Sequence, residues 1–349
     1  MYIPSKSKRF FIKKGILLIV IGIPRALMFY RFSPIWINFF SSLGVKVIVS
    51  GEEGKRILKE DSYTIPAEES CFPFKLAIIH AQTLVDKTDM IFLPRLIAIE
   101  KKGIMCPKFR GVPDIVRVIT KHKTPIISET YDIGKGKKEE EKFYLKIGMR
   151  LGFSSRLVKD AYLFAKEEFK KFEKGFINRL NAYSTSELFN YPYKIQMKDK
   201  KNYEFKVGVI GHPYNLYDID ISKGVLDIIK GMGIKVIPGD KLDINNFDKK
   251  FKALHKEIYW STGWEIVRGA LYFLEESDMD GVIFITSFKC GVDAIVMEFI
   301  KHQFKKLKGK IPLLVLSFDE HTSRDGVITR LEAFYELITT KKKNSLNYN

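Results

Sequence analysis

Two copies of one sequence skeleton constrain the fold of this chain more than any other feature. The segment IGIPRALMFYRFSPIWINFFSSLGVKVIVSG begins at Ile21, and IGHPYNLYDIDISKGVLDIIKGMGIKVIPGD begins at Ile210. In both, an Ile-Gly-x-Pro turn is followed at the same interval by Gly-x-Lys-Val-Ile. The match continues with DMIFLP at Asp89 against DGVIFIT at Asp280. This internal repeat predicts two similar units in one chain.

Each copy alternates short, apolar, β-branched segments with longer helical patterns, which is typical of parallel strands with helices on both faces of the sheet. We therefore expect an α/β fold with two Rossmann-like domains, at residues 1–130 and 204–349. Residues 131–203 are expected to form a helical linker that packs against the two domains. Its apolar side chains recur at helical spacing, at Leu157, Ala161, Phe164, Phe169, Phe172, Phe176 and Leu180.

Composition excludes several classes of protein. The net charge of +18 comes mostly from lysine, and neither clustered arginines nor a recognition motif indicates a nucleic-acid partner. The apolar run at residues 16–23 is too short to cross a bilayer and is predicted to be a buried strand, so no membrane association is expected. Three widely spaced cysteines do not form a secreted disulfide framework, which favours the cytoplasm.

The cysteines lie where parallel-sheet proteins place their chemistry, near the carboxyl ends of strands. Cys106 follows the segment DMIFL, Cys290 follows the equivalent segment of the second copy, and Cys71 precedes a predicted helix. Singly, each thiol would be read as a small core residue. Their joint placement instead predicts one metal site. Zinc with His80 or His321 as fourth ligand is one interpretation, and a 4Fe-4S cluster with one open iron is another.

The sequence resembles the 2-hydroxyacyl-CoA dehydratase superfamily, and more closely its acyl-CoA dehydratase activase-related (DUF2229) branch. The resemblance covers nearly the whole chain. It rests on GIPRALMFY at Gly22, EESCFPFK at Glu68, DMIFLPRL at Asp89, MCPKFRGVPD at Met105, CGVDA at Cys290 and SFDEHTSRDGVITRLEAF at Ser317.

This resemblance implies one 4Fe-4S cluster between two Rossmann-like domains, held by Cys71, Cys106 and Cys290. It also implies a separate ATP-dependent activase that delivers electrons, an acyl-CoA or other small anionic substrate, and a homodimer or heterodimer. The chain has no GxxxxGK[ST] loop, so ATP hydrolysis is assigned to the partner.

The loop SFDEHTSRDG at the end of the last predicted strand carries Glu320 and His321 as candidate catalytic residues. A histidine flanked by carboxylates can act as a general acid or base, although the loop can equally be a helix cap. Three functions stay open: an iron-sulfur enzyme for low-potential reduction or radical dehydration, a non-catalytic electron-transfer or accessory subunit, and a cluster-free two-domain protein that binds a small anion.

Overall fold

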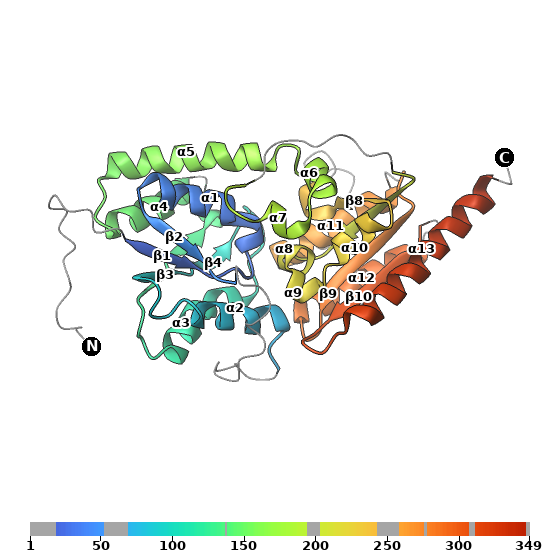
Figure 1. The fold of residues 1–349 in the computed structure, drawn as a ribbon, viewed down its shortest axis with the longest axis horizontal. Coiled ribbons are helices and arrows are strands. Elements are labelled where there is room, and N and C mark those ends of the chain that lie inside the picture. Colours follow the sequence, from blue (N-terminus) through green and yellow to red (C-terminus); the bar gives the residue numbers. More distant parts are fainter. Residues whose placement is uncertain are drawn as a thin grey trace.

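The computed structural model describes residues 19–51, 69–136, 138–193, 203–242, 258–275, 278–306 and 311–346. These residues form a mixed α/β structure with parallel sheets and thirteen α-helices. The molecule is elongated, with one four-stranded sheet in each half (Figure 1). No described helix is both long enough and apolar enough to cross a membrane.

The first sheet is parallel throughout and has the order β2-β1-β3-β5. Its strands are β1 (Val20–Ile23), β2 (Lys46–Val49), β3 (Met90–Phe92) and β5 (Ile126–Ile127). A two-stranded parallel ribbon adjoins it, formed by β4 (Arg95–Ala98) and β6 (Thr130–Asp132). One face is covered by α1 (Phe29–Ser42), α4 (Lys138–Arg150) and α5 (Ser155–Glu173), and the other by α2 (Phe72–Gln82) and α3 (Pro107–Ile119) (Figure 1).

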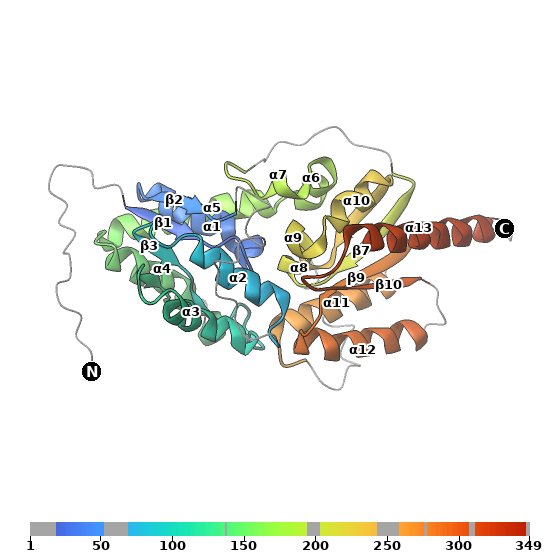
Figure 2. The same ribbon diagram turned by 60° about the horizontal axis from the view of Figure 1, so that its bottom comes forward.

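The second sheet is also parallel and has the order β8-β7-β9-β10. Its strands are β7 (Phe205–Ile210), β8 (Ile234–Pro238), β9 (Gly281–Ser287) and β10 (Leu313–Phe318). One face carries α10 (Val225–Gly231) and α13 (Arg324–Leu346), and the other carries α11 (Ser261–Glu275) and α12 (Gly291–Lys306) (Figure 2). Shorter helices complete this half: α6 (Phe176–Ala182), α7 (Thr185–Leu188), α8 (Pro213–Tyr217) and α9 (Ile219–Ser222).

The predicted alternation of strands and helices and the parallel pairing are confirmed. Within each sheet, the second strand along the chain lies at one edge, followed by the first, the third and the fourth. The strand predicted at residues 16–23 is described only from β1 onward, because residues 16–18 lie outside the described residues.

The apolar stripe predicted for residues 131–203 was partly wrong. Leu157 is 45% exposed and Phe164 is 51% exposed. Val158 and Ala165, each one position further along, are buried instead. Four other predicted positions are buried as expected: Ala161, Phe172, Phe176 and Leu180. The segment is also divided: α5 packs on α1, whereas α6 packs on β8 of the second sheet.

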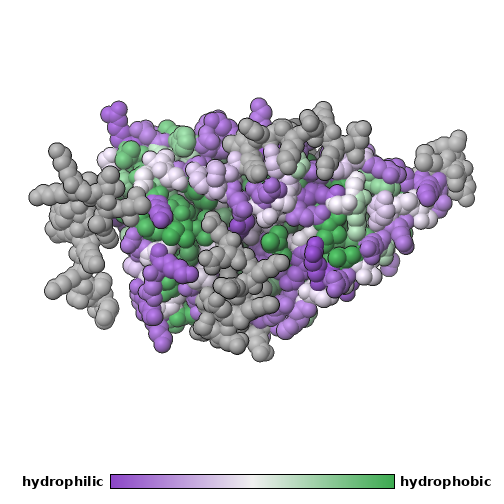
Figure 3. All heavy atoms as spheres, in the orientation of Figure 1, coloured by the Kyte–Doolittle hydropathy of each residue, from purple (hydrophilic) through white to green (hydrophobic). Residues whose placement is uncertain are grey.

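The apolar core is continuous between the two halves. One cluster of buried side chains includes Ile21 of β1, Phe189 after α7, Tyr217 of α8 and Ile283 of β9. Alternate residues of β9 point to opposite faces, so Phe284 packs instead with α11 and α12 in a second cluster. The face of the molecule seen in Figure 3 mixes hydrophilic side chains with smaller apolar patches. The two halves therefore share one hydrophobic interior.

Ion pairs also join the halves. Nη1 of Arg31 in α1 lies 2.8 Å from both carboxylate oxygens of Glu265 in α11. Nζ of Lys75 in α2 lies 2.7 Å from Oε1 of Glu320, which follows β10. These contacts fix the carboxyl ends of the first sheet against those of the second.

Candidate metal centre

All three cysteines directly precede a helix, as predicted. Cys71 and Cys106 are the N-terminal caps of α2 and α3, and Cys290 stands immediately before α12. Proline in the first turn of α2 and of α3 favours a helix start there. Among the described residues, the Cys71 thiol forms no capping hydrogen bond, so its sulfur is not used to begin α2.

The three thiols come together from distant parts of the sequence. Burial raises the pKa of Cys106, and negative charge on Cys71 raises it further. Burial likewise raises the pKa of Cys290 well above its usual range, with further contributions from Asp293, Cys71 and Cys106. Such charge effects act over several ångströms, so the three sulfurs face the same region of the molecule. Among the described residues, however, the group of possible ligand atoms within 4.8 Å of one another contains Cys290 and neither Cys71 nor Cys106.

Tyr214 of α8 lies among these thiols and is buried. Burial raises the pKa of its hydroxyl well above the usual range, and charge on Cys290, Asp293, Cys71 and Cys106 raises it further. Its ring stacks on His212, with 5.0 Å between ring centroids, and lies 6.2 Å from the ring of Phe109 in α3. Tyr214 thus fills the space between the cysteine-bearing helices with an apolar, uncharged ring.

Helix N-termini and a lysine oppose the effect of burial. A backbone hydrogen bond from Lys108 lowers the pKa of Cys106, and one from Asp293 lowers that of Cys290, each in part. Nζ of Lys108 also lies 3.4 Å from Sγ of Cys71. Amide groups and positive helix ends favour anionic sulfur. These interactions offset burial only in part, so the net pKa of Cys106 and of Cys290 stays raised and both are thiols until a metal replaces the proton.

A histidine and an aspartate adjoin Cys290. Ligand atoms of His212, Cys290 and Asp293 all lie within 4.8 Å of one another, close enough to hold a metal ion. Nε2 of His212 lies 2.8 Å from Oδ1 of Asp293, and both side chains are almost fully buried. The hydroxyl of Thr286 donates to Oδ2 of Asp293, and Nδ1 of His212 has no hydrogen-bond partner among the described residues.

The sequence interpretation missed His212 and Asp293 as site residues. One signal was present: when the two copies of the repeat are superimposed, His212 takes the position of the apolar Ile23. A titratable side chain in place of a core residue indicates a polar site at that strand end. Three thiols and an imidazole form a soft donor set that fits zinc or an iron-sulfur cluster.

The two candidate catalytic residues are less closely tied to this centre. Glu320 pairs with Lys75, one turn into α2 from Cys71. Burial would raise the pKa of Glu320, but the hydrogen bond from Lys75, a backbone hydrogen bond and the charges of Lys75 and His321 together outweigh it, so the net pKa is lowered. A carboxylate held ionised is a poor proton donor. His321 is exposed, and its backbone N–H donates to Asp319 in a tight turn before α13.

His80 does not join the thiols. It is buried near the C-terminal end of α2, with Nδ1 3.0 Å from Oγ of Ser50. Burial, and then the charge of Arg25, lowers its pKa to about 3. At a rise of about 1.5 Å per residue, nine residues place it about 14 Å along the helix from Cys71. The structure thus gives no support to His80 as a fourth ligand.

Gly211 is expected to be essential for placing His212. Its φ of +156° favours glycine, and a Cβ at this position would overlap the backbone oxygen of Ile285. Gly211→Ala should therefore lower the free energy of unfolding by about 2–4 kcal/mol in urea titrations. Gly231→Ala in α10 is the control, because open space surrounds it, and its effect should stay within about 1 kcal/mol. Equal effects of the two substitutions would contradict the packing argument.

Comparison with known proteins places the chain in a family. No curated protein matches it. The model of the CoA enzyme activase uncharacterised domain (DUF2229) matches residues 20–242, which is more than half of the 349 residues. The matched region includes Cys71, Cys106 and His212, and ends before Cys290. The family links the chain to CoA enzyme activation systems. The chain therefore belongs to the DUF2229 family of CoA enzyme activase domains.

Proposed function

We propose that Cys71, Cys106 and Cys290 hold one 4Fe-4S cluster between the two halves of the molecule. The observation that carries this proposal is the convergence of three thiols, each at the start of a different helix, in a largely buried space. Three thiolates fall one short of the usual four ligands, which leaves one iron for water, substrate or a non-cysteine ligand.

We also infer that the two halves are Rossmann-like domains related by an internal repeat, with approximate limits 1–130 and 204–349 and a helical segment at 131–203. The identical strand order of the two parallel sheets supports this inference. So does the Ile-Gly-x-Pro segment, which lies at the carboxyl end of β1 in one half and of β7 in the other. Each domain then directs its strand ends toward the cysteines.

When bound, such a cluster supplies one-electron transfer at low potential and a Lewis-acidic iron. The chain's own residues would keep it apart from water and balance its charge. Lys108 lies beside Cys71, and the α2, α3 and α12 N-termini offer backbone amides. His212 and Tyr214 provide an imidazole and a hydroxyl within the same enclosure. These features suit low-potential reduction or radical dehydration of a small substrate.

The wider role is proposed from the family and from the dehydratase resemblance. We infer that the chain works in the cytoplasm with an ATP-dependent activase as electron donor, and as a homodimer or heterodimer. Its substrate would be an acyl-CoA or another small anion. The same cluster in a non-catalytic subunit would instead relay electrons to a partner. An EPR signal that changes with acyl-CoA favours catalysis, and one that changes only with the partner favours relay.

One observation favours a second candidate, a mononuclear zinc site. His212, Cys290 and Asp293 are within coordinating distance of one another without any rearrangement. Zinc accepts nitrogen, sulfur and carboxylate ligands. This arrangement uses only one of the three cysteines, and it leaves the convergence of Cys71 and Cys106 unexplained.

Metal and sulfide analysis tests the proposal. Protein purified without oxygen should contain about four irons and four acid-labile sulfides per chain, and EPR should change on reduction with dithionite. Zinc in place of iron would support the mononuclear site. Protein that takes up neither metal after anaerobic reconstitution would overturn both, and would favour a two-domain protein that binds a small anion.

A further inference from the structure

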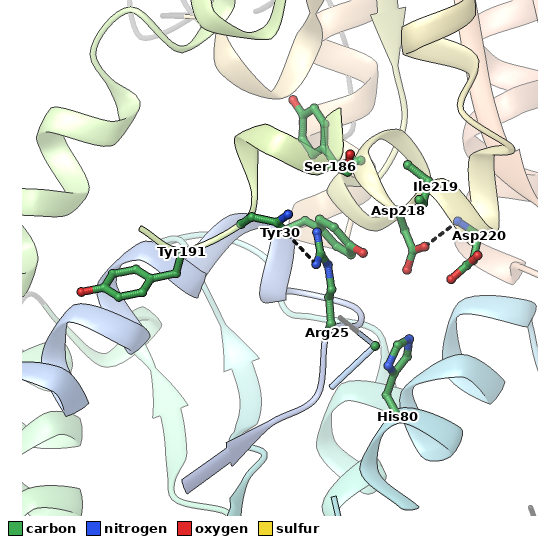
Figure 4. A pocket seen from close by; sticks show the side chains of 11 residues that line it. Arg25, Tyr30, His80, Ser186, Tyr191, Asp218, Ile219 and Asp220 are labelled. Carbon is green, nitrogen blue, oxygen red and sulfur yellow. Dashed lines mark hydrogen bonds between the residues drawn. The ribbon is translucent and has the colours of Figure 1, made fainter. Parts of the chain in front are cut away.

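A cavity of about 360 Å³ lies between the two halves, apart from the cysteines. Its volume falls within the range of about 300–1,000 Å³ that is usual for small-molecule sites. Arg25 follows β1, His80 is on α2, and Asp218 and Asp220 belong to the α9 turn. Figure 4 shows the two aspartates on the opposite side from Arg25 and His80. We call this cavity the Arg25–Asp218 pocket.

The pocket lies where parallel sheets bind ligands, outside the carboxyl ends of strands. Arg25 stands two residues after β1. Its backbone N–H donates to Oγ of Ser50, just after β2, and Nη1 donates to Oδ1 of Asn190 at 2.9 Å. A guanidinium has five N–H donors. The bond to Asn190 and a side-chain hydrogen bond with Tyr30 hold the group in place, and further N–H donors are left for an anion.

Asp218 is a buried carboxylate with one oxygen that lacks a hydrogen-bond donor among the described residues. Its side chain is 2% exposed and lines the pocket, and Oδ2 has no hydrogen-bond partner among the described residues. Oδ1 accepts a hydrogen bond from the backbone N–H of Asp220. A buried acceptor without a donor is unfavourable and is normally satisfied. A ligand with an N–H or O–H group would complete it.

The charges that line the pocket indicate what that ligand carries. Its described lining has one cation, Arg25, and two carboxylates, Asp218 and Asp220, whereas His80 is neutral near pH 7. Lys223 lies outside the lining and donates to the backbone oxygen of Asp220. The charge of Lys223 nevertheless acts on both aspartates, so the surroundings of the pocket are close to neutral. An ammonium group placed at Asp218 and Asp220 would supply the missing donor, and a carboxylate on the same ligand would pair with Arg25 and keep that balance.

We propose that the Arg25–Asp218 pocket binds a small zwitterion of the free amino acid class, with its ammonium group at Asp218 and Asp220 and its carboxylate at Arg25. The distance of about 14 Å along α2 between His80 and Cys71 keeps such a ligand away from the thiols. The pocket is therefore a second site, with an effector or a co-substrate as occupant.

A binding screen tests this proposal. The full chain, purified without oxygen, is heated in the presence of each proteinogenic L-amino acid, and the best stabiliser is then titrated by calorimetry. Its analogues, with hydroxyl or hydrogen in place of the ammonium group, should bind at least roughly tenfold more weakly. If alanine is the best stabiliser, for example, the affinities to compare are those of alanine, lactate and propionate. Failure of every amino acid to raise Tm, or equal binding of the hydroxy acid, overturns the proposal.

Substitutions locate the binding. Asp218→Asn and Arg25→Gln should each weaken binding of that amino acid by roughly 10- to 100-fold. Asp325→Asn, at the exposed start of α13, should leave it unchanged. Iron content should be the same in all three variants, so a failure here is distinct from failure of the cluster proposal. Unaltered binding by Asp218→Asn contradicts the site.

The stability of Asp218→Asn separates a binding role from a structural one. Burial, followed by the charge of Asp220, raises the pKa of Asp218 to about 7, while Arg25 lowers it in part. The folded chain thus binds a proton that the unfolded chain loses near pH 4, and ionised Asp218 costs stability above pH 7. Asp218→Asn should therefore raise the Tm of the free protein at pH 8 and less at pH 5. A lower Tm at both values indicates a structural role and overturns the assignment.

Discussion

Replacing Cys71 with serine is expected to remove most of the bound iron, although Cys71 does not belong to the group formed by His212, Cys290 and Asp293. A cluster held by three thiolates has no spare protein ligand, and a serine hydroxyl is a much weaker ligand for iron. Cys106→Ser and Cys290→Ser should behave in the same way. Iron and sulfide per chain, measured after anaerobic reconstitution, give the result.

The pattern across variants distinguishes the two metal sites. If only Cys290→Ser and His212→Ala lose metal, the mononuclear site is correct and the three-thiol cluster is wrong. Lys108→Gln is the matched control, since it changes the surroundings of Cys71 without removing a ligand. It should keep its iron and lower the midpoint reduction potential, because a positive charge close to the sulfur favours the reduced cluster.

Arg31→Met is expected to destabilise the folded chain by about 3–5 kcal/mol. Arg31 pairs through Nη1 with both oxygens of Glu265, which is 8% exposed. Burial lowers the pKa of Arg31, but Glu265, Asp240 and Glu100 raise it to a net value above the usual one. Removing the guanidinium leaves these acids together at the contact of α1 with α11. Urea unfolding of the metal-free chain measures the loss.

An exposed ion pair provides the comparison. Nη1 of Arg150 lies 2.8 Å from Oε1 of Glu129, with more than half of the arginine side chain exposed. Arg150→Met should therefore cost less than about 1 kcal/mol. The double substitution Arg31→Met with Glu265→Gln should recover part of the loss, because it removes the carboxylate that has lost its partner, whereas Asp240 and Glu100 keep theirs, Lys241 and Arg268. Similar effects of Arg31→Met and Arg150→Met would show that burial does not strengthen the first pair.

The parallel architecture and the positions of the cysteines could be predicted because they follow from local sequence. Short β-branched runs fix the strands, and strand ends and prolines fix where the helices after Cys71 and Cys106 begin. The internal repeat made Cys290 comparable with Cys106. In these places the local preference of the sequence agrees with the tertiary packing, so the sequence pattern alone predicted the strands and the helix starts.

The remaining parts depend on contacts between distant segments. Asp218 lines a pocket with Arg25, which lies nearly two hundred residues earlier in the sequence, and Arg31 reaches Glu265 over 234 residues. The hydrophobic periodicity of a sequence carries no information about which distant residues form such pairs. In α5 the predicted stripe found Ala161 and Phe172, but it took the exposed Leu157 in place of its buried neighbour Val158, because both are apolar and only the contact with α1 decides between them.

The hydrophobic interior that the two halves share determines when the cysteine site can form during folding. Buried side chains of β1, α8 and β9 belong to one cluster, so neither half can complete its packing without the other. Cys71 and Cys106 stand on one half and Cys290 on the other. The proposed three-thiol site would therefore be complete only after the whole chain has folded. If the proposal is correct, the cluster would be inserted after folding, and neither half alone would bind it.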